Sequence, residues 1–248
     1  MPIKQNIRKT LLFLAYSLNF PFAKWVLSRY IDQTDKYRQL LFDKFEINKV
    51  LDVGANIGQY AKRLQHAGFK GHLISFEPIN PIRELLAKSV VLFNNWQLLE
   101  FALGDQNQKS IINISGNTAS SSVLKMEVLH ELAAPESIFV GTQEIEVRTL
   151  DSLFDTLVEA SDKVFLKVDT QGYEWHVLQG SLQSLEKVWG LELEISFVQL
   201  YHGEHLFPEL YEFLLSKGFQ LYNIEPMLRD PHSGQLLQAD CVFFRSNT

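Results

Sequence analysis

The residues best placed for chemistry begin with a glycine-containing turn at 52–58, DVGANIG, which follows a short apolar run at 49–53. Gly54 and Gly58 allow the backbone to turn sharply and approach a ligand, and the N-terminus of the next helix would point at that ligand. Glu77 ends the following apolar run. A carboxylate there can accept hydrogen bonds from both ribose hydroxyls, so the two features together predict a cofactor that carries a nucleoside.

The same turn indicates which nucleoside cofactor to expect. A dinucleotide requires G-x-G-x-x-G, whose bare amides receive the pyrophosphate, whereas Asn56 stands at the second glycine position here. S-adenosylmethionine has no phosphate, and an acid at the strand end favours its sulfonium cation, directly or through water. We therefore expect this cofactor to be held by Asp52, Gly54, Ala55, Asn56, Gly58 and Glu77. The simpler alternative is a turn that only joins the strand to the helix. Glu77 argues against this alternative, because packing alone does not explain an acid at that position.

A second group of polar residues could activate a methyl acceptor. Methyl transfer from a sulfonium is one in-line displacement, and an alcohol acceptor must also lose a proton to a base or bind a metal. Asp169 ends the apolar run at 164–169. It is the first candidate for catalytic base, for a cofactor contact or for a metal ligand. The alternative is that it caps the helix that follows, and the two roles can coexist. His202 or His205 is an alternative base. Asp169, Glu204 and His202 are the candidate ligands for a divalent cation.

Charged residues inside the predicted strands need partners. Strand alternation places Lys167 and Asp169 on one face of their strand and Glu192 and Glu194 on one face of the next. Charges in a sheet that is covered on both faces are costly unless they are paired. We expect Lys167 to pair with Glu192 or Glu194. The alternative makes Glu194, nearest the strand end, a catalytic-site residue in the wall of the acceptor site.

Alternating strands and helices must position these residues. The sequence predicts strands at 49–53, 72–76, 96–102, 164–169, 188–196, 219–224 and 239–245, with helices at 59–67, 81–88, 174–185 and 208–217. This alternation is typical of an α/β fold, with a mainly parallel sheet and helices on both faces. The turn-rich stretch 226–235 predicts that the last two strands form an antiparallel edge hairpin. Two β-like runs, 110–114 and 144–147, flank a serine-rich stretch at 115–122 that either closes over the site or is a solvated connection.

The first 45 residues differ from the remainder. Apolar residues recur there at spacings of three and four, which predicts a helical extension at 1–45 ahead of a catalytic domain at 46–248. The extension has eight Lys and Arg against three Asp, a net charge of +5, and the remainder carries −11. We expect the extension to pack on the domain; dimerisation, a lid over the acceptor and peripheral contact with a membrane stay open.

Composition excludes several classes of protein. An acidic body argues against nucleic acid as a partner. The single cysteine, Cys241, excludes an intrachain disulfide and a cysteine-cluster zinc site. The sequence shows no transmembrane stretch and no signal-peptide cleavage site after the basic N-terminus, so we expect a cytoplasmic protein.

Seven stretches in order make the chain resemble the FkbM family of methyltransferases: LDVGANIGQY (51–60), SFEP (75–78), ALGD (102–105), VRTLDSL (147–153), LKVDTQGYEWHVLQG (166–180), LELEISFVQLY (191–201) and QADCVFFR (238–245). The resemblance implies a seven-stranded Rossmann-like class I fold, with Pro78 and Ala102 beside S-adenosylmethionine. It also implies methylation of a hydroxyl on a small-molecule or glycan acceptor, such as a saccharide or polyketide. Gln171 departs from the family's usual D-x-E-G. A non-catalytic cofactor-binding or adaptor domain and an N-methyltransferase are the alternatives.

Overall fold

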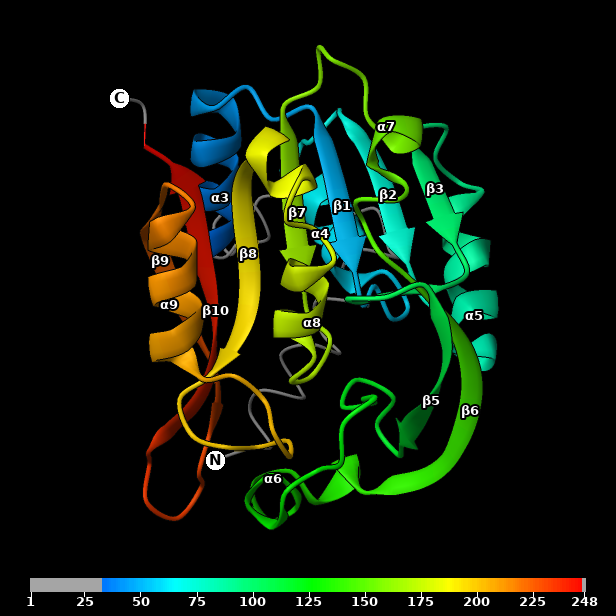
Figure 1. Cartoon of the computed structure of the whole chain (residues 1–248), viewed down its shortest axis with the longest axis vertical. Coiled ribbons are helices and arrows are strands. Elements are labelled where there is room, and N and C mark those ends of the chain that lie inside the picture. Colours follow the sequence, from blue (N-terminus) through cyan, green and yellow to red (C-terminus); the bar gives the residue numbers. More distant parts are fainter. Residues whose placement is uncertain (1–32, 247–248) are drawn as a thin grey trace, which may run out of the picture.

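The structure, a computed structural model, describes residues 33–246. Its centre is a seven-stranded sheet in the order β3-β2-β1-β7-β8-β10-β9 (Figure 1). Five strands run parallel: β3 (Trp96–Leu99), β2 (His72–Phe76), β1 (Lys49–Val53), β7 (Val164–Val168) and β8 (Val188–Ser196). β10 (Leu236–Arg245) runs antiparallel between β8 and β9 (Phe219–Arg229). The mainly parallel Rossmann-like sheet and its antiparallel edge hairpin are therefore confirmed.

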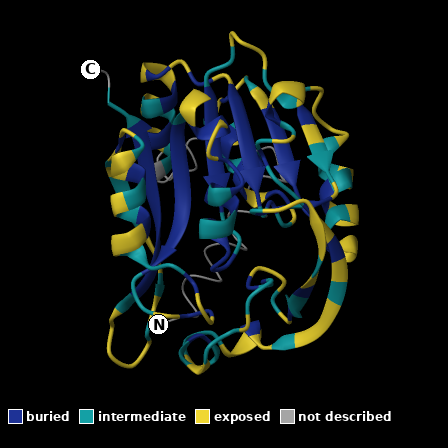
Figure 2. Cartoon of the chain, in the orientation of Figure 1, coloured by how far each residue is buried: buried dark blue, intermediate teal, exposed yellow. Residues whose placement is uncertain are grey.

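Helices cover both faces of this sheet, as predicted. One face packs against α3 (Gln33–Lys44), α4 (Gln59–Ala67) and α5 (Asn80–Val90), and the other against α7 (Phe154–Leu157), α8 (Glu174–Gln179), η2 (Ser184–Lys187) and α9 (Phe207–Ser216). Strand alternation divides the apolar core accordingly: Leu51 and Val53 face α8 and α9, whereas Val50 faces α3 and α4. The strands between these layers are almost wholly buried (Figure 2).

A smaller three-stranded sheet lies beyond the carboxyl ends of the parallel strands (Figure 1). It contains β4 (Ala102–Leu103), β6 (Phe139–Arg148) and β5 (Gln108–Ser115), and its connection carries α6 (Val128–Ala133) and η1 (Pro135–Ser137). The two β-like runs of the sequence thus pair with each other, antiparallel. The single strand predicted at 96–102 is wrong, because it ends at Leu99, the chain bends at Phe101, and Ala102 joins the smaller sheet.

The helix predicted at 174–185 is also too long. α8 ends at Gln179, where Gly180 lies so close to the neighbouring backbone that a Cβ would sit 1.9 Å from the Gly104 carbonyl oxygen. The chain then turns and forms the short η2 helix. The close backbone contact, which no periodicity reveals, therefore sets the end of this helix.

α3 is the described part of the predicted N-terminal extension. Phe42 and Phe45 of this region are buried in one cluster with Phe165 and Phe244 of the sheet, so this part packs on the domain. The rest of the extension, residues 1–32, lies outside the described residues, and the boundary at 45 stays a prediction. Within residues 33–246, no helix has the length and apolar character needed to cross a membrane.

Candidate functional site

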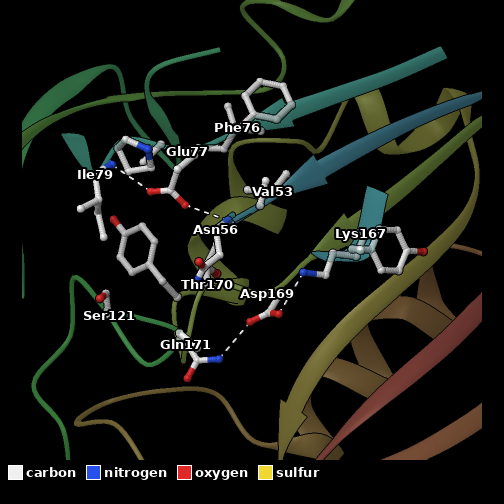
Figure 3. A pocket seen from close by; sticks show the side chains of 18 of the residues that line it. Val53, Asn56, Phe76, Glu77, Ile79, Ser121, Lys167, Asp169, Thr170 and Gln171 are labelled. Carbon is white, nitrogen blue, oxygen red and sulfur yellow. Dashed lines mark hydrogen bonds and ion pairs between the residues drawn. The ribbon is translucent and has the colours of Figure 1, made fainter. Parts of the chain in front are cut away.

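A cavity of about 220 Å³ opens at the carboxyl ends of β1, β2 and β7, between the large sheet and the smaller one. Of the residues expected to bind the cofactor, seven line it: Gly54, Ala55, Asn56, Glu77, Pro78, Ala102 and Asp169. Figure 3 shows Glu77 and Asp169 in this cavity, with Asn56 between their strands. The structure thus brings most of the predicted set together.

The glycine turn after β1 has the left-handed backbone that its residue types allow. Gly54 has φ +77°, and a Cβ there would lie 1.9 Å from the carbonyl oxygen of Asp169, so the ends of β1 and β7 are in direct backbone contact. Gly58 does not line the cavity, contrary to expectation. A Cβ on Gly58 would strike the ring of Trp96 at 2.6 Å, so this glycine allows α4 to pack closely.

Glu77 stabilises the glycine turn through hydrogen bonds and also lines the cavity. Its Oε2 accepts a hydrogen bond from the Asn56 amide at 2.9 Å, and its Oε1 accepts one from the Ile79 amide at 2.8 Å (Figure 3). The residue is only 4% exposed, and this burial raises the pKa of its carboxyl to about 7. Each oxygen keeps acceptor capacity for a further donor in the cavity.

Asp52 lies apart from the other predicted contacts. It is 0% exposed and is not among the residues that line the cavity. Ser75 donates a hydrogen bond to its Oδ2 at 3.3 Å, and the Lys167 ammonium lies 3.7 Å from its Oδ1. Burial raises the pKa of Asp52 to about 6. Asp52 therefore does not line the cavity in this structure, and its contact with the cofactor, directly or through water, stays a prediction.

Asp169 is the acid that two neighbours hold in the cavity. Lys167 Nζ donates to its Oδ2 at 2.9 Å, and Gln171 Nε2 donates to its Oδ1 at 2.9 Å. Burial alone would raise the pKa of Asp169, but Lys167 and these hydrogen bonds bring it below its ordinary value. The expected ion pair between Lys167 and Glu192 or Glu194 is wrong: Lys167 pairs with Asp169, while Arg38 of α3 donates to Glu192 at 2.8 Å.

Gln171 links the acids behind Asp169. Its amide nitrogen donates to both Asp169 and Glu194, and its Oε1 accepts a hydrogen bond from the Tyr201 hydroxyl at 2.8 Å. Glu194 is buried and does not line the cavity, so its position does not support the alternative in which it forms the wall of the acceptor site. Burial and the charge of Asp169 raise the pKa of Glu194. The side-chain amide of Gln171 has two N–H groups and donates to both carboxylates, whereas a glutamate there could donate at most one hydrogen bond, and only when protonated.

The remaining predicted residues lie outside the cavity. His202 has a 78% exposed side chain, and its Nδ1 is 3.2 Å from Glu127. Glu204 accepts hydrogen bonds from the backbone amides of Leu200 and Tyr201, and these bonds stabilise the loop that contains it. The structure therefore does not bring Asp169, Glu204 and His202 together, and no group of three potential metal-binding side chains occurs within residues 33–246. His205 stacks on Trp175 instead of facing the site.

Several cavity residues were not predicted from the sequence. The loop between β5 and β6 contributes Thr118, Ala119 and Ser121, which agrees with the serine-rich stretch closing over the site. Tyr60, Arg63, Met227 and Asp240 line the side toward β9 and β10. The signal for Asp240 was present, because it is the only charged residue within the apolar run LLQADCVFF of the last strand.

The chain is similar to several methyltransferases. A 164-residue alignment with the 2-O-methyltransferase NoeI of Sinorhizobium fredii is 24% identical and covers 62% of this chain and 66% of that protein, just under two thirds of its length. Similar solved structures include the SAM-bound magnesium protoporphyrin IX methyltransferase ChlM of Synechocystis, at TM-score 0.48 and 11% identity over 88% of this chain and 79% of that one. The fibrillarin of Methanococcus jannaschii has TM-score 0.47 and 14% identity, over 82% and 68% of the two chains. Residues 52–221 match the family described as the methyltransferase FkbM domain, and the chain belongs to this family of methyltransferases.

Proposed function

We propose that the protein transfers a methyl group from S-adenosylmethionine to a hydroxyl of a saccharide, a polyketide or a related metabolite. The observation that carries the proposal is the joint position of Glu77, the Gly54 turn and Asp169 in one cavity. The chain's family and its similarity to a protein described as a 2-O-methyltransferase support transfer to oxygen.

The chemistry of the cavity fits an adenosyl group that ends in a cation. Glu77 offers two carboxylate oxygens for ribose hydroxyls, and apolar residues beside it, Pro78, Ile79 and Ala102, can flank a purine ring. Asp169 stands at the other end of this arrangement and carries negative charge, which favours a sulfonium. When bound there, S-adenosylmethionine supplies an electrophilic methyl group.

Asp169 then has two tasks on the acceptor. It accepts a hydrogen bond from the reacting hydroxyl and so orients the oxygen, which supplies much of the rate in a displacement reaction. Its low pKa makes it a weak base for an intact alcohol. The hydroxyl proton becomes acidic as the oxygen bonds to carbon, and Asp169 takes the proton at that stage. Lys167 and Gln171 fix the carboxylate for both tasks.

The proposal is tested by calorimetric titration of the purified full chain with S-adenosylmethionine and S-adenosylhomocysteine, with NAD as a control. We expect both methyl-donor forms to bind, and NAD not to bind. Glu77→Gln should weaken the binding of both ligands by about tenfold or more, because it removes the charge from the group that hydrogen-bonds to the ribose. Folded protein that binds neither form would overturn the cofactor assignment.

Catalysis is tested separately with radiolabelled S-adenosylmethionine and a panel of hydroxylated and amino acceptors. We expect methyl label on a hydroxyl. Asp169→Asn should lower the rate of this transfer by a factor of about 10²–10⁴. Label on nitrogen would identify an N-methyltransferase instead. Cofactor binding without transfer to any member of a broad panel would favour a non-catalytic binding domain.

A further inference from the structure

Four carboxylates stand side by side across the strands at one end of the large sheet. Asp240 of β10 pairs in register with Glu194 of β8 and with Glu225 of β9. Lys167 is level with Glu192, so Asp169, two residues on, is level with Glu194. We call Asp169, Glu194, Asp240 and Glu225 the carboxylate row.

The row lies on the face of the sheet that α3 and α4 cover. Val242 and Phe244 follow Asp240 at every second position of β10, and they belong to the apolar cluster of that face. Ala239 and Cys241, at the positions between, belong to the cluster on the opposite face. Asp240 therefore projects toward the α4 side, where Tyr60 and Arg63 of α4 also line the cavity.

Asp240 differs from the other members of the row in its partners. Asp169 is paired with Lys167, Glu194 receives the Gln171 amide, and Glu225 lies 3.5 Å from Arg38. Within residues 33–246, the side chain of Asp240 makes no hydrogen bond and no ion pair, although it is only 7% exposed and lines the cavity. A buried carboxyl without a partner is costly unless a ligand supplies one.

The order of the strands separates Asp240 from the part of the cavity that fits the methyl donor. Glu77 follows β2, Asp169 follows β7, and Asp240 lies on β10, so each step crosses two strand spacings, or about 10 Å. With the ribose at Glu77 and the reacting group at Asp169, the space toward Asp240 is left for the second substrate.

We propose that Asp240 binds the acceptor, and that its carboxyl group exchanges hydrogen bonds with hydroxyls of a neutral, polyhydroxylated molecule. The proposal rests on the proposed function, because it takes the other half of the cavity as the methyl-donor site. Tyr60 and Met227 line the same half and offer apolar surface to the C–H face of such an acceptor.

The charges around Asp240 favour a neutral acceptor over an anionic one. Asp169 carries negative charge and repels anions, and the basic side chain in this half, Arg63, is already bonded to Asp35 at 2.8 Å. Burial, and then the charges of Glu192 and Asp169, raise the pKa of Asp240. A protonated carboxyl both donates and accepts a hydrogen bond, as does each hydroxyl of a diol.

The test uses three glycosides with the same ring and different charge: methyl glucoside, methyl glucosaminide and methyl glucuronide. Their binding to the full chain, saturated with S-adenosylhomocysteine, is measured by saturation-transfer NMR. We expect methyl glucoside to bind about tenfold more tightly than methyl glucuronide. Asp240→Ala should weaken methyl glucoside binding about tenfold through the loss of its hydrogen bonds, while Asp240→Asn, which keeps one acceptor oxygen, should weaken it less.

Glu77→Gln is the matched control from the other half of the cavity. This variant should weaken the binding of S-adenosylhomocysteine. When the concentration of that ligand is raised until it again saturates the protein, methyl glucoside binding should be unchanged. The Asp240 variants should bind S-adenosylhomocysteine as the wild type does, which also shows that they are folded.

Three results would overturn the inference while the methyl-donor site stands: equal binding of methyl glucoside to wild type and Asp240→Ala, a preference for methyl glucuronide, or no binding of any glycoside to the cofactor-loaded wild type. A preference for methyl glucosaminide would overturn the hydroxyl assignment in favour of an amine. Failure of the wild type to bind S-adenosylhomocysteine would instead contradict the proposed function itself.

Discussion

The contact between Gly54 and the Asp169 backbone joins the ends of β1 and β7, which line the cavity. A side chain at position 54 would meet two separate costs, a left-handed backbone and a collision with a carbonyl oxygen. Gly203 has nearly the same backbone, φ +76°, but open space where its Cβ would stand. The chain therefore offers a pair of glycines that separates the two costs.

Gly54→Ala should lower the free energy of unfolding by about 2–5 kcal/mol, the sum of backbone strain and overpacking. Gly203→Ala should cost about 1–2 kcal/mol, from strain alone. Denaturant unfolding of both variants measures the difference. Equal losses would show that the β1 and β7 ends can separate without cost.

Glu77 should make binding of the methyl donor depend on pH. Its carboxyl has a pKa of about 7 in the free protein because it is buried, and ribose hydroxyls bind the ionised form. Ligand binding therefore expels the proton, and affinity should rise with pH through about 7 and then level off. The gain between pH 6 and pH 8 should be about tenfold.

Calorimetry with S-adenosylhomocysteine across this range, in buffers of different ionisation enthalpy, measures both the affinity and the released proton. Glu77→Gln should remove most of the dependence. A wild-type affinity that stays constant from pH 6 to pH 8 would contradict the assignment of Glu77 to the ribose.

At the scale of elements, the sequence predicted the large sheet better than the small one. The strands at 49–53, 72–76 and 188–196 have the bounds expected from their apolar runs, because both of their faces are buried. The smaller sheet has an exposed face, and β4 has only two residues, so its pattern was weak. The contact of Lys167 with Asp169, two residues away, and that of Arg38 with the distant Glu192 depend on side-chain reach that strand alternation does not fix.

The predicted site shows the same division. Gly54, Asn56 and Glu77 were found because they belong to one strand-turn-helix unit and the strand after it, whose local geometry is set by nearby residues. Asp240 was missed because it reaches the cavity from a strand of opposite direction at the far end of the chain. His202 was predicted from its residue type alone, and its loop leaves it in solvent.

The Ser122 hydroxyl should help to hold the loop between β5 and β6 over the cavity, together with the backbone hydrogen bonds between Asn113 and Ser122. Ser122 Oγ donates to the backbone oxygen of Gln171 at 2.6 Å. Ser122→Ala leaves that buried oxygen without this donor and should cost about 1–3 kcal/mol in local stability. We expect faster hydrogen exchange at 116–124 and weaker S-adenosylhomocysteine binding. Ser152→Ala, at an exposed site, is the control; unchanged exchange in both variants would show that the loop is held elsewhere.

For the molecule as a whole, buried acids should place the stability maximum on the acid side of neutrality. Burial raises the pKa to about 6 for Asp52, about 7 for Glu77 and about 8 for Glu174. Their pKa values are higher in the folded chain than in the unfolded one, so the stability they contribute is complete at low pH and is lost as the pH rises through these values. His130 acts in the opposite sense: burial lowers its pKa to about 4, so its contribution is lost as the pH falls below its ordinary value.

Thermal unfolding at constant ionic strength should therefore show the highest Tm near about pH 5 and a decline toward pH 8.5. Glu77→Gln should reduce the decline between pH 6 and pH 8, because it removes one of the groups that titrate there. A wild-type Tm that rises steadily from pH 5 to pH 8.5 would show that these carboxyls are not held protonated by the fold.

The reversed direction of β10 also affects how acceptor preference can change. β9 and β10 form one continuous hairpin, from Phe219 to Arg245, and it brings Met227 and Asp240 to the acceptor half of the cavity. The residues that fit the methyl donor come from earlier in the chain, between 53 and 171. On the assignment proposed above, Met227 and Asp240 contact the acceptor from this hairpin, while Tyr60 and Asp169 contact it from the earlier part of the chain. We therefore predict that exchange of this single terminal hairpin between relatives changes the preference for the acceptor and leaves binding of the methyl donor unchanged.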